Sequence, residues 1–190
     1  MDETTGARID SRLGSRVDPL VDPEREATAP DPTRDLLLAW LGSKRRHVRA
    51  QVAEMTPHDR RAARLPSGWT PLGLVQHLTR DVETYWFAHA LAGEDVDLPV
   101  GHAGWEVAED ADDVALLAAY DHACVHSDEV VRTLDLDDPP ARPTGVPYAS
   151  VHEVLLHVLV ETATHAGHLD AVRELADGHQ RLVLDAPDEG

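Results

Sequence analysis

Several residue types that mark well-known classes of protein are scarce in this sequence. Its only cysteine, Cys124, cannot form a disulfide within the chain. No stretch approaches the roughly 18 uninterrupted apolar residues of a membrane span, and the first residues lack the apolar core of a secretory signal. Basic residues are few, because 17 Lys and Arg stand against 35 Asp and Glu, and a net charge of −18 argues against a nucleic-acid partner. We therefore expect a cytoplasmic protein with neither a nucleic acid nor a membrane as its partner.

The length and composition favour one globular domain. The chain has 190 residues, of which 42% are hydrophobic, and this is enough to form a core without disulfides or metal. Residues 1–31 mix charged residues with Gly and Pro and show no apolar period, so they predict a flexible N-terminal tail. Residues 32–190 are expected to form the folded domain.

Four long segments have the periodicity of amphipathic helices. They cover about 32–54, a stretch that begins at 70–71 and extends past 86, about 111–134, and about 150–178. The expected core side chains are Leu36, Leu37, Trp40, Leu41, Val48 and Val52 in the first, Leu72, Val75, Leu78, Val82 and Trp86 in the second, Val114, Leu117, Ala118, Cys124, Val125 and Val131 in the third, and Val154, Val158, Val172 and Leu175 in the fourth. No alternating segment suggests a strand, so the prediction is an all-α four-helix bundle. The long connection between the second and third helices could cross the bundle.

Local signals mark where these helices begin. An N-cap residue followed by proline occurs at 31–32, 56–57 and 70–71, and the second of these predicts a short extra helix. Ser150 and Glu153 have the spacing of a capping box at the start of the last helix. In the first helix, Lys44, Arg45, Arg46 and Arg49 form a basic stretch that is either a solvated surface or a docking surface for an anionic group.

Histidine is abundant, with 12 in the chain, and the last helix carries a cluster. Glu161 and His165 lie about 40° apart on the helical wheel, and His157 and His168 fall within about 40° of Glu161 on its other side. All four are expected on one face, which its apolar neighbours turn toward the core. Because an unpaired buried carboxylate costs several kcal/mol, Glu161 requires a paired group or a cation.

His77 lies in the apolar segment VQHL of the second helix and could meet this cluster. Together with Glu161 and His165 it would supply two imidazoles and one carboxylate. Such a set binds Zn²⁺, Ni²⁺, Mn²⁺ or Fe²⁺ and leaves positions open for water or substrate. The spacing alone also allows ordinary structural histidines.

Other catalytic motifs do not fit these residues. His152 and Glu153 resemble the start of a metalloprotease zinc motif, in which a second histidine follows four residues after the first. Here the second histidine, His157, follows after five residues, about 140° around the helix, so the two histidines cannot bind one zinc. Di-iron bundles need histidine three residues after glutamate, and the residue three after Glu161 is Thr164. The sequence has no Gly-x-Ser-x-Gly, P-loop or Gly-x-Gly-x-x-Gly motif. Hydrolase, NTPase and Rossmann classes therefore have no support.

Three segments resemble a known family. They are SGWTPLGLVQHL (67–78), ETYWF (83–87) and LLHVLVETATHAGHLDAVRELADG (155–178). They are similar to the DinB/YfiT-like superfamily, in the actinobacterial branch of mycothiol S-transferases, and the similarity extends over 32–178. The resemblance implies a four-helix bundle whose first metal ligand is His77. Mycothiol-dependent maleylpyruvate isomerase is similar in using Glu-x-x-x-His, which corresponds to Glu161 and His165. The sequence departs from the branch at Thr164, where arginine is frequent.

The resemblance implies a divalent-metal-dependent transferase, with zinc expected and nickel, manganese or iron as alternatives. A metal-bound thiol loses its proton near neutral pH, so mycothiol could attack a small electrophile in detoxification or secondary metabolism without a protein cysteine. Isomerisation results if the thiol is later expelled. His168 and Asp81 are then candidate catalytic residues, as hydrogen-bond acceptors or proton carriers. The partners are this low-molecular-weight thiol and the electrophile, and a homodimer is left open.

Two other functions remain as alternatives. One is a non-catalytic, metal-bearing module that binds a small molecule or acts in a stress response. The other is a hydrolase that uses metal-bound hydroxide. Turnover separates the first from the transferase, because a binding module would release no conjugate.

Overall fold

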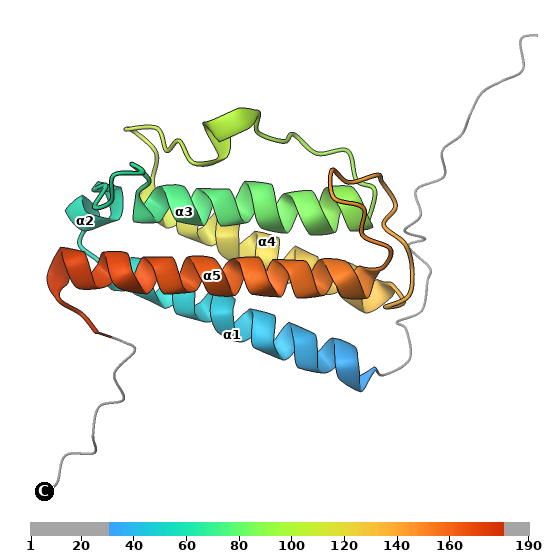
Figure 1. Cartoon of the computed structure of the whole chain (residues 1–190). Coiled ribbons are helices and arrows are strands. Elements are labelled where there is room, and N and C mark those ends of the chain that lie inside the picture. The colour runs from blue at the N-terminus through green and yellow to red at the C-terminus, as the bar shows by residue number, and fades with distance from the viewer. Residues whose placement is uncertain (1–30, 181–190) are drawn as a thin grey trace, which may run out of the picture.

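The computed structural model describes residues 31–180 and shows the predicted all-α fold (Figure 1). Within these residues there are helices and loops but no strand. The elements are α1 (Pro32–Glu54), α2 (Pro57–Arg61), α3 (Pro71–His77), η1 (Leu78–Leu91), η2 (Gly101–Gly104), α4 (Asp113–Thr133) and α5 (Val151–Asp177). The prediction of a tail over residues 1–31 falls, apart from Asp31, outside the described residues. No helix among those described is both long and apolar enough to cross a membrane.

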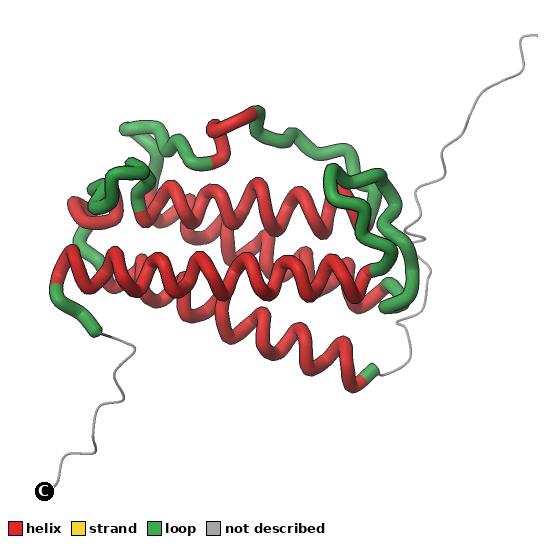
Figure 2. The backbone as a smooth tube through the Cα atoms, viewed as in Figure 1, coloured by secondary structure: helices red, strands yellow, loops and turns green. Residues whose placement is uncertain are grey.

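The bundle has four long helical segments, called rods below. They are α1, the continuous segment formed by α3 and η1, α4, and α5. Helices α1 and α5 run in the same direction, and the other two rods run in the opposite direction (Figure 1). The guanidinium of Arg34, near the start of α1, donates to the carbonyl of Leu134 just after α4 at 2.9 Å, so these ends meet. Since η1 and α4 are parallel, the 92–112 connection must return along the whole bundle, as Figure 2 shows. This is the crossover that the long predicted loop allowed.

The helix starts follow the predicted caps. The side chains of Asp31, Thr56 and Thr70 accept backbone N–H groups of the first turn, and proline follows each of them. At α5, Ser150 Oγ accepts the N–H of Glu153 at 3.3 Å. The Glu153 carboxylate accepts the N–H of the preceding residue, Ala149, at 2.7 Å, rather than that of Ser150. The second hydrogen bond of the capping box, from a backbone N–H to the Glu153 side chain, therefore comes from Ala149 and not from the N-cap residue.

The second predicted helix changes its hydrogen-bonding pattern at the candidate site. Residues Pro71–His77 are α-helical, and Leu78–Leu91 are π-helical, with the wider spacing of i to i+5. The N–H of Ala92 continues the pattern by donating to the carbonyl of Phe87 at 2.9 Å. Periodicity does not distinguish the two helix types, so the sequence gives no sign of this change. Wide turns of this kind are frequent at functional sites.

The core contains most, but not all, of the side chains that periodicity assigned to it. Leu41, Val48, Val75, Val131 and Val158 are fully buried, or nearly so. The prediction was wrong for a set of large apolar side chains that are more than half exposed, namely Leu36, Trp40, Val114, Val125 and Leu175. These lie at the edges of apolar stripes that are wider than the area the neighbouring helices cover.

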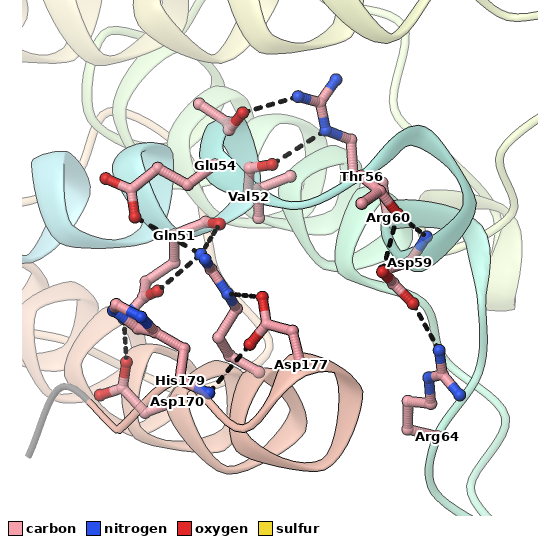
Figure 3. A network of polar contacts seen from close by, with 12 residues as sticks. Gln51, Val52, Glu54, Thr56, Asp59, Arg60, Arg64, Asp170, Asp177 and His179 are labelled. Atoms are coloured by element: carbon pink, nitrogen blue, oxygen red, sulfur yellow. Dashed lines mark hydrogen bonds and ion pairs between the residues drawn. The ribbon is translucent and has the colours of Figure 1, made fainter.

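Two polar networks fasten α1 to its neighbours. Buried Arg45 donates to both carboxylate oxygens of Glu83 at 2.8 and 2.6 Å and to Asp128 at 2.7 Å, so this part of the basic stretch is internal. Near the C-terminal end of α1, Arg173 of α5 donates to the backbone and side-chain oxygens of Gln51. Figure 3 shows Gln51 and Asp177 in this network. Because a buried charge without its partner is costly, these contacts disfavour any packing of α1 that would separate Arg45 or Arg173 from its partners.

Candidate metal centre

The structure brings together the three residues of the predicted metal site, His77, Glu161 and His165, which are called the cluster below. His77 ends α3, while Glu161 and His165 lie one turn apart on α5. One nitrogen or oxygen atom from each lies within 4.8 Å of the other two. His77 Nε2 is 3.7 Å and His165 Nε2 is 3.9 Å from the same oxygen, Glu161 Oε1. This is the only such group found in residues 31–180.

The surroundings of His77 test whether a cation fits here. Its Nδ1 is 2.8 Å from Oδ2 of Asp81, and because a carboxylate only accepts hydrogen bonds, Nδ1 carries the proton. In the neutral imidazole this leaves a lone pair on Nε2, which is buried and has no hydrogen-bond partner. The lone pair faces the Glu161 carboxylate across 3.7 Å, too far for a hydrogen bond. Two electron-rich atoms held face to face are the arrangement that a shared cation relieves, so the residues fit a metal ion.

The charges of the other two groups also suit metal binding. The surrounding imidazoles, that of His77 most and then those of His157 and His165, lower the pKa of Glu161 where they offer a proton or a positive charge to its carboxylate, and burial opposes this effect. Burial, reinforced by His77, lowers the pKa of His165 to about 4. At neutral pH these groups are therefore a carboxylate and a neutral imidazole, which are the forms that bind a cation.

His157 and His168 take different positions from those of the three central residues. His157 Nε2 lies 2.9 Å from the second carboxylate oxygen of Glu161, so it orients that group from the far side. His168 is exposed, and its ring centre is 5.9 Å from that of His165. The face does not point fully into the core as predicted: Glu161 is 26% exposed, whereas its neighbour Thr162 is fully buried. The cluster therefore lies on the flank of α5, where a small molecule could reach it.

Trp105, which no pattern in the sequence marks as a site residue, lies directly against the cluster. Its ring stacks on that of His77, with centres 4.0 Å apart and planes inclined by 14°. It also meets the ring of His165 edge-on at 5.6 Å. Trp105 follows η2 in the long crossing loop, so this part of the loop forms a wall of the site.

Two glycines and one glutamine fix this wall in place. A Cβ at Gly104 would lie 1.9 Å from Asp81 Oδ2, and one at Gly73 would lie 2.6 Å from the carbonyl oxygen of Trp105. The side-chain amide of Gln76 donates to three loop carbonyls, those of residues 103, 104 and 106, at 3.2, 3.2 and 2.8 Å. The glycines in the TPLG and GHAGW segments were the available sequence signal, but only the fold shows that these segments touch.

Two cavities adjoin the cluster. One, of about 360 Å³, is lined by Ser67, Gly68, Trp69, His102, Trp105 and Glu106. The other, of about 280 Å³, is lined by Asp81, Tyr85, Leu98 and Pro99. Each shares one residue with the site, Trp105 in the first and Asp81 in the second. Small-molecule space therefore lies against two residues, Trp105 and Asp81, that contact the His77 imidazole.

The described chain is thus a four-helix bundle with an accessible His-Glu-His cluster beside two cavities. The model of the mycothiol-S-transferase family matches residues 36–178, and the chain belongs to this family. The matched region extends from α1 to the residue after α5 and includes all three cluster residues. No curated protein and no solved structure matches the chain.

Proposed function

We propose that the protein is a divalent-metal-dependent S-transferase that uses mycothiol. The observation that carries the metal dependence is the buried, unpartnered Nε2 of His77, which faces the Glu161 carboxylate. The family supports mycothiol as the thiol. The ligands we propose are His77, Glu161 and His165, with zinc as the expected ion, because two imidazoles and a carboxylate leave zinc a position for an exchangeable ligand.

A divalent cation bound here supplies one chemical effect, which is to lower the pKa of a thiol that it coordinates. The protein side chains do the rest. Asp81 acts as a positioning residue, because its hydrogen bond keeps the proton on His77 Nδ1 and leaves Nε2 free. Trp105 covers one face of that imidazole and keeps water from it. We assign His168, at the exposed rim, to carry the thiol proton to solvent.

In the transfer, a bond forms between the thiol sulfur and an electrophilic carbon. With a haloarene the carbon–halogen bond breaks and the halide leaves with the bonding electron pair. The thiol proton passes to His168 and then to water. No protein nucleophile is required, which agrees with a chain whose only cysteine is on α4.

The direct test is detection of the conjugate by mass spectrometry. Protein purified without an affinity tag is incubated with zinc, mycothiol and a panel of electrophiles that includes a haloarene and a bimane. Conjugate above the uncatalysed level, with much less from glutathione, supports the transferase. Tight binding of mycothiol with no conjugate from any electrophile would instead indicate a binding module. If mycothiol does not bind, the proposal fails.

A further inference from the structure

The larger cavity beside the cluster is lined by two indole rings that pack against the core but stay partly exposed. Two indole rings, those of Trp69 and Trp105, form its walls, with centres 6.4 Å apart and planes inclined by 55°. Its volume of about 360 Å³ is within the range of small-molecule sites, roughly 300–1,000 Å³. An open aromatic corner of this kind is a binding surface, because the rings offer large apolar faces at a low cost in conformational entropy.

The rim of the cavity is polar. Ser67, His102 and Glu106 line it and are exposed, and their side chains make no hydrogen bond to another described residue. Together they offer a hydroxyl, an imidazole and a carboxylate, which can both donate and accept. Aromatic faces edged by free polar groups suit a ligand that is apolar on its ring faces and rich in hydroxyls around its edge. That is the chemistry of a sugar or a cyclitol.

The location of this cavity relates it to the cluster. Trp105 is a wall of the cavity and also stacks on the His77 ring, so one indole separates the two. The wall is held by Gln76 and by the close approach of its backbone to Gly73. A ligand in the cavity is therefore fixed beside the cluster by a wall that does not have to form on binding, which favours affinity.

We infer that this cavity binds the glucosamine–inositol part of the thiol cosubstrate while its cysteinyl arm reaches around Trp105 to the cluster. The inference rests on the proposed function. It also accounts for the choice of thiol. Glutathione has no sugar to place against the indoles, and its two carboxylates would be repelled by Glu106 and by a chain of net charge −18.

The test separates sugar binding from chemistry by using two thiols. Trp69→Leu removes one wall, and the ring contact of Trp69 is with Trp105 and not with a cluster histidine. N-acetylcysteine is a thiol without the sugar. We expect the variant to raise KM for mycothiol about tenfold with kcat nearly unchanged, since tenfold corresponds to about 1.4 kcal/mol, which one aromatic contact can contribute. Its kinetics with N-acetylcysteine should equal those of the wild type. The matched control is Trp40→Leu, which removes an exposed indole on α1 and should change neither thiol.

A binding measurement makes the result independent of turnover. The thiol-free glucosamine–inositol compound is titrated into metal-free protein by calorimetry, and we expect saturable binding that Trp69→Leu weakens about tenfold. An unchanged KM for mycothiol in the variant, or equal losses with both thiols, would overturn the inference. If the wild type forms no conjugate with either thiol, the proposed function fails, and binding of the sugar compound still decides whether the cavity is a sugar site.

Discussion

Oδ2 of Asp81 lies 2.8 Å from Nδ1 of His77, one turn earlier on the same rod, and this contact decides which nitrogen of the imidazole faces the cluster. Without it, either tautomer would be available and the lone pair could point toward the helix. The contact spans the change from α- to π-helical structure, since His77 is the last residue of α3 and Asp81 lies in the first turn of η1. The orientation of His77, the first of the proposed ligands, is thus set within one helical segment, before α5 contributes.

The first prediction concerns metal content. Untagged wild-type protein should carry one divalent ion per chain, and Glu161→Gln and His165→Ala should each lose it, because two donors do not hold the ion against dilution. Elemental analysis by mass spectrometry measures the occupancy. His122→Ala, which removes an exposed histidine on α4, is the matched control and should keep full occupancy. Full metal occupancy in both Glu161→Gln and His165→Ala would show that these residues are not the ligands, and His157 or His168 would have to take their place.

The second prediction tests the support that Asp81 gives to His77. Asp81→Ala should weaken metal binding about 10- to 100-fold, the usual effect of removing a group that orients a histidine ligand. Gly104→Ala should do nearly the same, because its Cβ would occupy the position of Asp81 Oδ2 and displace that carboxylate. Competition against a chelating dye measures the affinity.

The double variant distinguishes this pathway from two independent effects. Asp81→Ala with Gly104→Ala should bind metal no more weakly than Asp81→Ala alone, because both changes remove the same contact. Gly145→Ala is the control, since a Cβ there meets no atom within 4 Å. Losses that add in the double variant would show that Gly104 acts through the loop and not through Asp81.

Local signals in the sequence predicted the helices well, whereas contacts between distant segments were not visible in it. The starts at Pro32 and Pro71 depend on a cap and a proline in the same turn, so a short stretch contains all the information. The pair Glu161 and His165 was found because helical spacing fixes which residues share a face. Trp105 was missed because its place against His77 depends on how a long loop docks across the bundle.

The burial of side chains shows the same limit of prediction from local sequence. Periodicity assigned both Leu41 and Trp40 to the core, yet Leu41 is fully buried and Trp40 is 55% exposed. The two are consecutive in the sequence and lie about 100° apart on the helical wheel, so an apolar stripe that includes both is wide, and the position of the neighbouring helices decides which of them is covered. The width of an apolar stripe is a property of one helix, whereas the width of the buried face belongs to the bundle.

The third prediction concerns Cys124. Burial, together with the negative charge of Glu83, raises the pKa of this thiol. A raised pKa keeps the thiol protonated, so the native protein should contain little thiolate at pH 8 and should react slowly with iodoacetamide, with a rate that keeps rising above pH 9. Protein unfolded in guanidinium should react as an ordinary cysteine, with a pKa of about 8.5.

Transfer activity provides the matching check on Cys124. Cys124→Ala should form the mycothiol conjugate at the wild-type rate, because the proposed mechanism uses no protein sulfur. Fast alkylation of the native protein at pH 7, or loss of conjugate in the variant, would contradict this prediction and would indicate a nucleophilic cysteine.

The last prediction separates the stability of the bundle from that of the metal site. The four rods bury an apolar core of their own, which includes Leu72, Phe87 and Leu155, and none of these is a metal ligand. The fold should therefore persist when the metal is removed, unlike that of a small domain whose folding depends on its ion. A chelator should abolish activity while circular dichroism at 222 nm keeps its helical signal.

Thermal unfolding should show the contribution of the ion as a modest shift. A metal present at a hundredfold excess over its Kd stabilises the native state by about 2.7 kcal/mol, so chelation should lower Tm by several degrees, and zinc should restore it. Glu161→Gln serves as the control, because a variant that holds no metal should show the same Tm with and without chelator. Collapse of the helical signal at room temperature when the chelator is added would show that the ion, and not the core, holds the bundle together.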